Sequence, residues 1–508
     1  MRHAPERLER ALLYATAVIV AGSVLAIGGA PVPVVLVFGA AAVLVGLMST
    51  FLGRPRAGVG PVLVLLGLGV YSALQAIPLP IRWLEVLSPA AADVWSRCLL
   101  PLGESVTTGS LSLDPGASLV ESLKWCSYAG LWYAASALSG RGGCERLLGL
   151  VFGSCVLVAI ASLGHLLIGA ERVWGMYEPL NPIPPSHVGP LLNPNSLAGY
   201  TNLGVLVGLG LLFRDPPVLP RAMLGGGLVI LLTASLRTAS RGGIAALLVG
   251  ILAFGIATTV ASRRREGRLS AAKAIVSATG ALVALAVMIV LSSADAYFWT
   301  ELKSENEVKL QLPGWVMPMA SDHPWFGVGR GAFATVFQAY RPLGGGNIVF
   351  THAENFVIHW IAEWGLLVAV AAMAAFGWML RPTNMGFGRS TLTTGAWTGV
   401  AILLLQNLVD LGTELYGVGV AIAVTLGAVW GDVLRRGRGR VLKTARDVRP
   451  RVRAALACGA PALALAAVFG AHPVEQDRSE LAERVAAAHG LEARRQLYDE
   501  VRARTLRH

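Results

Sequence analysis

The sequence predicts an all-α, polytopic integral membrane protein with about twelve to thirteen transmembrane helices, and two observations carry this prediction. First, 54% of the 508 residues are hydrophobic and only 14% are charged, with a mean hydropathy of +0.60. That is far more apolar surface than a soluble core can bury. Second, the apolar residues fall into runs of roughly 17 to 25, the length that crosses a bilayer as a helix with its backbone hydrogen bonds satisfied.

The candidate spans follow one another along almost the whole chain. Their ranges are 11–30, 32–52, 59–77, 119–138, 147–168, 196–213, 222–236, 242–260, 274–293, 356–380, 391–409, 416–434 and 454–471. The seventh and the last have the weakest patterns. We therefore expect one membrane domain that fills most of the sequence.

The basic residues favour one orientation of these spans. The net charge of +12 and the pI near 9.9 would indicate a nucleic-acid partner in a soluble protein. Here, however, the arginines gather at the N-terminus and in every second short connection, as at 54–56, 141–146 and 263–268. Such connections face the cytoplasm and contact anionic lipid, so we expect membrane lipid and no nucleic acid as a partner.

The opposite connections face outward, and three of them are long. They comprise two medium loops, 78–118 and 169–195, and one large loop, 295–355. Long connections are uncommon without a purpose. The predicted organisation is an N-terminal part with the first outer loop (1–118), a membrane core (119–434), a basic cytoplasmic segment (435–453), a weak last span (454–471) and a charged helical tail (472–508).

One stretch, 323–367, combines the polar residues expected of a site with the start of a span. Its loop holds five charged or titratable residues, namely His323, Arg330, Arg341, His352 and Glu354. The following helix carries His359 and Glu363 four residues apart, and therefore on one face. Ionisable groups inside a span are functional by default, although Glu363 also suits packing against a neighbouring helix.

Two arginines, Arg237 and Arg241, lie in SLRTASRGG on the expected outer side, against the charge rule. Arginine binds phosphate oxygens in a fork, and the adjacent glycines permit close approach, so this segment is a candidate diphosphate site. The alternative is that both side chains extend to the membrane interface.

Asparagines precede two of the predicted spans. Asn193 and Asn195 flank a proline before the span at 196, and Asn355 precedes the span at 356. Helix capping is one reading of all three. The other is recognition of sugar hydroxyls, since amides both donate and accept hydrogen bonds. His323 and Asp410, which lies in the next outer turn, are two further candidates. Together the five residues are the candidate contacts to a sugar, including a sugar that accepts a transferred group.

The sequence does not favour a metal or nucleotide cofactor. The outer loops contain neither a DxD pair nor HExxH, and the glycines at 327, 329 and 331 lack the strand-turn-helix setting and the GK[ST] of a nucleotide loop. Of five cysteines only Cys98 is expected on the outer side, so no disulfide framework is predicted there.

The order of these motifs resembles that of a known family. NPNSLAGY opens one span, TASRGG precedes another, and a long outer loop with DHPWFGVGRGAF ends in a His-x-Glu-Asn element and AEWGLL. This order, over about 119–434, resembles the O-antigen ligase and O-antigen polymerase superfamily of bacterial envelope glycosyltransferases, and it implies a GT-C-like fold in the inner membrane with an active site facing the periplasm.

The resemblance implies transfer of a glycan from an undecaprenyl-diphosphate carrier to an acceptor hydroxyl, without metal or nucleotide. The acceptor is lipid A-core for a ligase and a second lipid-linked glycan for a polymerase. Arg241 matches the family's Ser-Arg-Gly arginine, while Lys309, Arg330 or Arg341, with Arg237, supply further diphosphate contacts. The family's usual His-Asn pair is absent, because Glu354 precedes Asn355 and His352 lies two residues earlier, so either Glu354 or His352 is the expected base.

A transporter or flippase for a lipid-linked glycan is the alternative. Such a protein places its site near mid-membrane between broken helices, with charges inside the bundle. Most of the candidate residues lie instead at the expected outer ends of spans, and Lys124 is the main exception.

Overall fold

The computed structural model describes most of the membrane domain. The described residues are 3–52, 60–98, 105–178, 189–266, 269–293, 299–300, 307–341, 350–437 and the single positions 484, 487 and 496. The predicted last span at 454–471 and nearly all of the charged tail lie outside the described residues.

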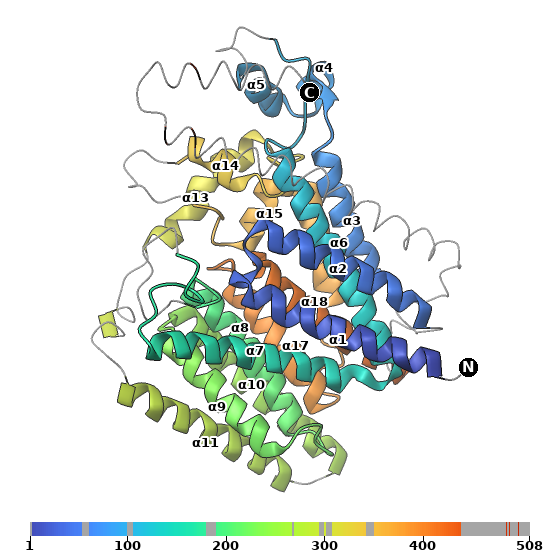
Figure 1. The fold of residues 1–508 in the computed structure, drawn as a ribbon, viewed down its shortest axis with the longest axis vertical. Coiled ribbons are helices and arrows are strands. Elements are labelled where there is room, and N and C mark those ends of the chain that lie inside the picture. Colours follow the sequence, from blue (N-terminus) through green and yellow to red (C-terminus); the bar gives the residue numbers. More distant parts are fainter. Residues whose placement is uncertain are drawn as a thin grey trace.

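The described chain is almost entirely helical, as predicted, and its principal helices form one bundle (Figure 1). These helices are α1 (His3–Leu25), α2 (Val32–Ser49), α3 (Gly60–Gln75), α6 (Pro115–Leu138), α7 (Cys144–Leu167), α8 (Pro194–Leu212), α9 (Arg221–Arg237), α10 (Arg241–Glu266), α11 (Leu269–Ser293), α15 (Phe356–Trp364), α16 (Leu366–Met379), α17 (Thr391–Gln406) and α18 (Tyr416–Arg435). Each of the first twelve predicted spans overlaps one of them, except that the tenth is divided between α15 and α16.

Six helical segments of the described chain are long and apolar enough to cross a membrane. They are Glu6–Leu25, Val32–Leu52, Pro115–Leu167, Pro194–Leu212, Arg241–Ala261 and Tyr416–Arg435. Shorter apolar helices accompany them at Gly60–Gln75, Ala278–Leu291, Leu366–Met379 and Thr391–Gln406. The all-α polytopic class is therefore confirmed.

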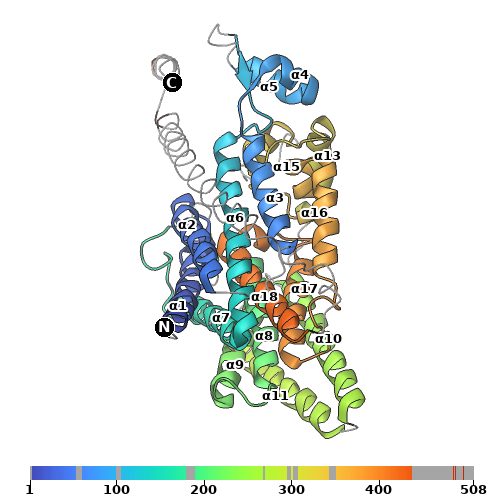
Figure 2. The same ribbon diagram turned by 90° about the vertical axis from the view of Figure 1, so that its right-hand side faces the viewer.

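The centre of the bundle is formed by α6, α8 and α18, most of whose residues are buried. α6 packs against α2, α3 and α18, and α8 packs against α7, α9 and α17. Figure 2 shows α3 and α6 side by side above α9, α10 and α11. Two of these central helices, α6 and α8, begin with proline after a side-chain cap, Asp114 for α6 and Asn193 for α8, which fixes their first turns.

Shorter elements lie at one end of the bundle. A two-stranded ribbon of β1 (Leu79–Pro80) and β2 (Thr108–Gly109) accompanies α4 (Ile81–Leu87) and α5 (Pro89–Cys98). The large predicted loop is partly helical, with α13 (Glu307–Asp322), α14 (Phe333–Val336) and the 3-10 turn η6 (Phe337–Ala339). A further 3-10 turn, η7 (Gly412–Glu414), joins α17 to α18.

The chain after α13 crosses the break between α15 and α16. The backbone N–H groups of Val328 and Gly329 donate to the carbonyls of Ala362 and Glu363 at 2.9 and 3.2 Å. The break itself is at Gly365, whose φ of 78° is open to glycine and strained for other residues. This crossing holds the residue that follows, Arg330, against the end of α15.

Candidate functional site

The centre of the candidate site is Arg330, whose side chain is only 2% exposed. Its guanidinium donates to three carboxylates: from Nε to Glu121 Oε2 at 3.1 Å, from Nη1 to Glu363 Oε2 at 2.8 Å, and from Nη2 to Glu414 Oε2. The carboxylates come from α6, α15 and η7. One cation therefore joins three segments that are far apart in the sequence, and we call these four residues the Arg330 cluster.

Gln75, at the end of α3, fixes the backbone around this cluster. Its side-chain oxygen accepts from the Arg330 N–H at 3.1 Å, and its Nε2 donates to the carbonyls of Phe326 and Glu363 at 2.7 and 3.0 Å. From the other side, the hydroxyl of Ser118 donates to the Arg330 carbonyl at 2.7 Å. Arg330 is thus held at its backbone as well as at its guanidinium.

The charges around Arg330 nearly balance. Lys124 Nζ lies 2.5 Å from Glu121 Oε1, and His359 Nε2 lies 3.3 Å from Glu363 Oε2. With both cations charged, all three carboxylates ionised and the histidine neutral, one negative charge remains in excess. A buried carboxylate is tolerated only with such partners, so the cluster depends on Lys124 as well as on Arg330.

The ionisation of Glu414 and Arg330, the two cluster residues that lie outside the α-helices, follows from this arrangement. Burial alone would raise the pKa of Glu414, but the adjacent Arg330 guanidinium lowers that pKa to about 2. For Arg330, burial opposes the charge, whereas Glu414, Glu121 and Glu363 together raise its pKa well above the usual range. Both groups are therefore charged at neutral pH.

His352 lies beside the Arg330 cluster. Its ring centroid is 5.3 Å from that of His359, and its Nδ1 lies 2.9 Å from the hydroxyl oxygen of Thr351. Burial is the main cause that lowers the pKa of His352 to about 4, and the neighbouring His359 lowers it further in the same direction. Its imidazole is therefore neutral, and able to accept a proton, from about pH 5 upward.

Glu354 has a different setting. It is partly buried, and its φ of 50° lies in the left-handed region that non-glycine residues seldom adopt. The next residue, Asn355, caps α15 by accepting from the N–H groups of Val357 and Ile358 at 3.0 and 3.1 Å. The capping interpretation of Asn355 is confirmed.

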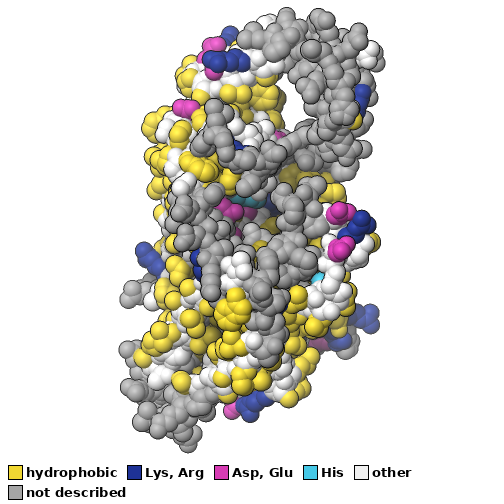
Figure 3. Space-filling view, turned by 90° about the vertical axis from the view of Figure 1, so that its left-hand side faces the viewer, with side chains coloured by type: hydrophobic (Ala, Val, Ile, Leu, Met, Phe, Trp, Pro, Cys, Tyr) yellow, Lys and Arg dark blue, Asp and Glu magenta, His cyan; other side chains and the backbone are white. Residues whose placement is uncertain are grey.

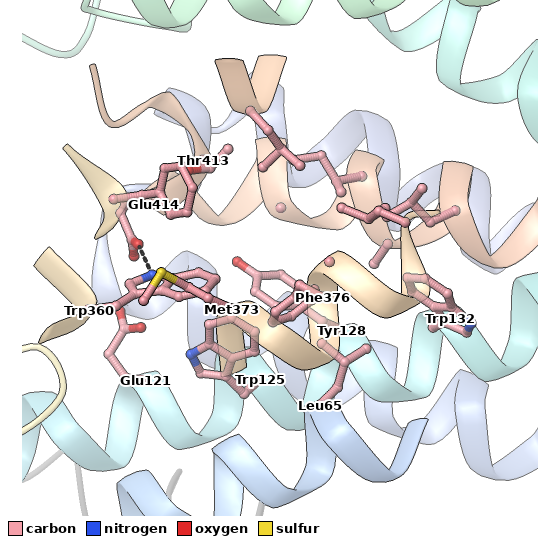
Figure 4. A pocket seen from close by; sticks show the side chains of 18 of the residues that line it. Leu65, Glu121, Trp125, Tyr128, Trp132, Trp360, Met373, Phe376, Thr413 and Glu414 are labelled. Carbon is pink, nitrogen blue, oxygen red and sulfur yellow. Dashed lines mark hydrogen bonds between the residues drawn. The ribbon is translucent and has the colours of Figure 1, made fainter. Parts of the chain in front are cut away.

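An apolar cavity of about 350 Å³ opens against the Arg330 cluster. Figure 4 shows Glu121, Trp125, Tyr128 and Trp132 following one another along α6 on one side of this cavity. The cavity is lined by residues of α3, α6, α15, α16, α17, η7 and α18, most of them apolar or aromatic. An apolar chamber is thus placed next to buried charge.

The polar end of the cavity is formed by Glu121 and Glu414. Trp360 Nε1 donates to Glu414 Oε1 at 3.3 Å, and both residues face the cavity (Figure 4). On the molecular surface, acidic, basic and histidine side chains gather in a central hollow between apolar regions (Figure 3).

The segment around Arg241 forms a second polar group. Ser240 Oγ donates to Asn195 Oδ1 at 2.6 Å, and Ala239 just before it has a left-handed φ of 53°. Arg241 is exposed at the first position of α10, and Arg237 is partly buried at the end of α9. Asn193 caps α8 by accepting from the N–H of Asn195 at 2.8 Å, which confirms the capping interpretation for this residue.

The turn between α17 and α18 connects the two groups. Gln406 Nε2 donates to the Asn195 carbonyl at 2.7 Å, and Asn355 Nδ2 donates to the Leu408 carbonyl at 2.8 Å. Asp410, which is 3% exposed, lies in the same turn, four residues before Glu414. One connection therefore contacts both the Arg241 segment and the Arg330 cluster.

Three further residues predicted from the sequence, Arg341, His323 and Lys309, lie in the large loop, 295–355. The Arg341 guanidinium lies over the Phe350 ring, 5.7 Å from its centroid. His323 is 2% exposed and lies just after α13, where burial lowers its pKa. Lys309 belongs to α13, and its side chain is outside the described residues.

The candidate set from sequence omitted Glu121 and Gln75, which lie inside predicted spans. A signal for Glu121 was available, because it begins a row at helical spacing with Trp125, Tyr128 and Trp132, and a carboxylate within a span needs a partner. The expectation that Lys124 is the main charge inside the bundle was too narrow, since Glu121, His359 and Glu363 are also buried in helices.

The fold and the site define a polytopic membrane protein with an apolar cavity beside a buried ionic cluster. Residues 226–373 match the family model described as O-antigen ligase, so the chain is similar to this family over that range. The matched range contains Arg237, Arg241, Arg330, His352 and Glu363, whereas Glu121 and Glu414 lie outside it. Members of this family are ligases and polymerases of the glycosyltransferase type. A search of curated proteins found no match to the chain.

Proposed function

We propose that this protein transfers an undecaprenyl-diphosphate-linked glycan to an acceptor hydroxyl at the periplasmic face of the bacterial inner membrane. The observation that carries the proposal is the apolar cavity of about 350 Å³ that ends at the Arg330 cluster. A lipid-linked glycan has a long apolar chain joined to a polar head. A cavity with aromatic walls and a charged end suits the junction between the apolar chain and the polar head.

The cavity would hold the part of the polyprenyl chain next to the diphosphate. Trp125, Tyr128 and Trp132 provide a continuous aromatic wall along α6, and Phe376 faces them from α16. Flat aromatic and branched apolar surfaces pack well together. The head group would then lie toward the hollow where the polar side chains gather.

The diphosphate contacts are assigned to cations that the Arg330 cluster does not neutralise. Arg241 is exposed at the start of α10, where helical N–H groups also favour an anion. Arg237, Arg341 and Lys309 are the further candidates. Arg330 itself is assigned a positioning role, because its guanidinium already donates to three carboxylates.

His352 is assigned as the base. The acceptor oxygen attacks the anomeric carbon, the bond from that carbon to the diphosphate oxygen breaks, and the acceptor proton passes to His352. The products are the new glycoside and undecaprenyl diphosphate, with inversion because there is one displacement. A pKa near 4 makes His352 a weak base, which suffices because the diphosphate is a good leaving group when arginine offsets its charge. Glu354 is the alternative base.

Acceptor contacts are assigned to the polar residues between the two groups. The Asn195 carbonyl accepts from Gln406 Nε2, and Asp410 lies four residues after Gln406 in the chain. Asn193, Asn355 and His323 are the further candidates. Carboxylate and amide groups recognise sugar hydroxyls by accepting and donating hydrogen bonds. No metal or nucleotide enters this scheme.

Ligase and polymerase activities use the same chemistry and differ in the acceptor. A ligase transfers the glycan to lipid A-core, and a polymerase transfers it to a second carrier-linked glycan. Deleting the gene and separating lipopolysaccharide by electrophoresis distinguishes them. Long carrier-bound chains accumulate without a ligase, whereas single repeats accumulate without a polymerase.

The substitution Arg241→Ala tests the diphosphate assignment. We expect transfer to be lost while the protein is still expressed and folded, because Arg241 is exposed at the first position of α10. Arg172→Ala, which removes an exposed arginine paired with Glu178, is the matched control and should retain activity. Full activity in Arg241→Ala would refute the assignment.

Transport or flipping of a lipid-linked glycan is a second candidate function, and one observation favours it. Glu121, Lys124, His359 and Glu363 are ionisable groups within helices, and α15 and α16 form a broken helix at the Arg330 cluster. Both features are typical of transporter sites. Turnover by purified protein in detergent, where there is no second compartment, separates the two functions.

A further inference from the structure

A short helical arm, residues 79–98, projects at one end of the bundle and exposes apolar side chains. Trp83, Val86 and Leu87 are 57%, 82% and 38% exposed. Their spacing of three and four residues places them on one face of α4. Figures 1 and 2 show α4 and α5 beyond the end of α3.

The arm is nevertheless folded onto the rest of the protein by its other face. Leu84 is fully buried and packs with Ala91 and Ala92 of α5. Trp95 Nε1 donates to the carbonyl of Ser110 at 2.9 Å. The exposed apolar face is therefore an additional surface and is not the core of the arm.

This face follows a row of exposed apolar residues that lie on α3 and just after its end. Leu63, Val70, Leu74 and Ile77 are 47%, 36%, 52% and 46% exposed, at spacings of seven, four and three residues. An apolar helix of a membrane protein presents such a row to lipid. The exposed face of α4 begins six residues after Ile77.

We propose that the arm lies in the interfacial layer of the leaflet on the site side, with Trp83, Val86 and Leu87 inserted among the lipids. The occupant of the face is lipid because the α3 row leads to it and because a tryptophan beside aliphatic residues suits headgroup depth. Arg82 and Glu85 are exposed on the remaining face of α4, where they contact water and headgroups. The inference requires only that the chain spans the membrane, so it does not depend on the glycan transfer proposed above.

Lipid contact at the arm bears on the site through the segment that follows it. The N–H of Ser112 donates to the Gln75 carbonyl at 2.8 Å, and the N–H of Leu113 donates to the Val328 carbonyl at 2.9 Å. The Ser112 hydroxyl lies 2.7 Å from that of Ser118, which donates to the Arg330 carbonyl. Residues 112–118, which follow the arm in the chain, therefore connect the end of α3 with the Arg330 backbone.

Site-directed spin labelling of the full chain in lipid nanodiscs tests this placement. Cys98 and Cys458 are replaced by serine, and a nitroxide is attached to Val86→Cys or, as a matched control on the same helix, to Glu85→Cys. Collision with oxygen, which concentrates in lipid, is compared with collision with a water-soluble nickel chelate. Thermal unfolding of each labelled protein establishes that it is folded.

The expected result is that the label at position 86 collides mainly with oxygen and is shielded from nickel, whereas nickel reaches the label at position 85. Equal access of nickel to both positions would place the arm in water and overturn the proposal. Shielding of position 86 from both reagents would show that protein covers the face, and would overturn it as well.

Discussion

Arg330 illustrates how one buried residue organises three distant segments. Its guanidinium donates to Glu121, Glu363 and Glu414, and its backbone is held by Gln75 and Ser118. Burying such charges is costly, and the cost is offset only while every partner is present. The residue therefore stabilises the site geometry and makes that geometry sensitive to single substitutions.

Replacing Arg330 by methionine should strongly destabilise the protein, because it leaves three buried carboxylates without their shared cation. The expected loss is about 3 to 5 kcal/mol of unfolding free energy. Thermal unfolding of the purified protein measures it. Arg97→Met, which removes a largely exposed arginine from its pair with Asp93, should change stability little. Equal melting temperatures for the two variants would contradict the account of the cluster.

The choice between His352 and Glu354 as the base is open to a direct comparison. His352→Gln should lower the transfer rate by about 100- to 10,000-fold, the usual contribution of a general base, while Glu354→Gln should retain most activity. Initial rates under saturating donor and acceptor measure both. The reverse ranking would move the base to Glu354.

The pH dependence follows from the lowered pKa of His352, which is about 4. Because only the neutral imidazole accepts a proton, activity should persist as the pH falls through 6.5 and decline near pH 4. The free energy of unfolding depends on pH in the same direction. Because the unfolded histidine binds a proton at a higher pH than the folded one, stability falls as the pH drops from about 6.5 toward 4. A rate profile that declines around pH 6.5 would indicate a solvated histidine instead.

Individual site residues were predictable only where they stood out against their surroundings. Arg330, His352 and Glu354 are polar residues in a loop before a span, and Arg241 opposes the charge rule. Gln75 gives no such signal, because its importance comes from contacts across the bundle, whereas Glu121 is marked only by its charge within a predicted span. The neutralisation of Arg330 by three carboxylates is likewise a property of tertiary structure, and no local pattern encodes it.

At the scale of elements, the break between α15 and α16 shows what the glycines of the loop do. Gly327, Gly329 and Gly331 all have positive φ, and Gly327 and Gly329 pack against the backbone of Glu363 and against Ser112. These glycines allow the loop to cross the helix break closely. Their structural role is therefore to let the loop pass close to the backbone of α15.

Gly329→Ala tests the importance of this crossing. A Cβ at position 329 would collide with Ser112, and the φ of 100° is strained for alanine, so we expect destabilisation of more than about 1 kcal/mol. Gly149→Ala in α7, where a Cβ meets nothing within 4 Å, is the control and should be neutral or stabilising. Thermal unfolding compares the two, and equal stability would show that the crossing tolerates a side chain.

The positions of the helices were predictable because the bilayer imposes a simple length requirement on each span. Runs such as 32–52, 119–138 and 416–434 overlap α2, α6 and α18. The division of 356–380 at Gly365 was not predicted, since one glycine in an apolar run is compatible with a continuous helix. The helices within the large loop depend on packing against α15, which the sequence pattern does not show.

For the whole molecule, the central relation is between the cavity and the Arg330 cluster. The cavity lies among helices from both ends of the described sequence, α3 and α6 on one side and α16, α17 and α18 on the other. Neither its walls nor its polar end belong to one segment. If it holds a polyprenyl chain, filling it should weaken donor binding without disturbing the chemistry.

Gly377→Leu is designed to fill the cavity. Gly377 lines it, and a Cβ there meets nothing within 4 Å, so the larger side chain should enter the chamber without disrupting the fold. We expect KM for a long-chain donor to rise about tenfold, equivalent to about 1.4 kcal/mol, with little change for a donor with a short prenyl chain. Gly153→Leu in α7, also without a neighbour within 4 Å, is the control. Equal effects on both donors would argue against a chain in the cavity.

The most direct test of the account is turnover by the purified protein in detergent micelles. The reaction contains a glycan linked to undecaprenyl diphosphate and either lipid A-core or a second carrier-linked glycan, with no nucleotide and no added metal. We expect the native protein to form the glycosylated acceptor and Arg241→Ala to lose that product. Folded, lipid-supplemented protein that yields no glycosylated product with either acceptor would contradict the proposed transfer.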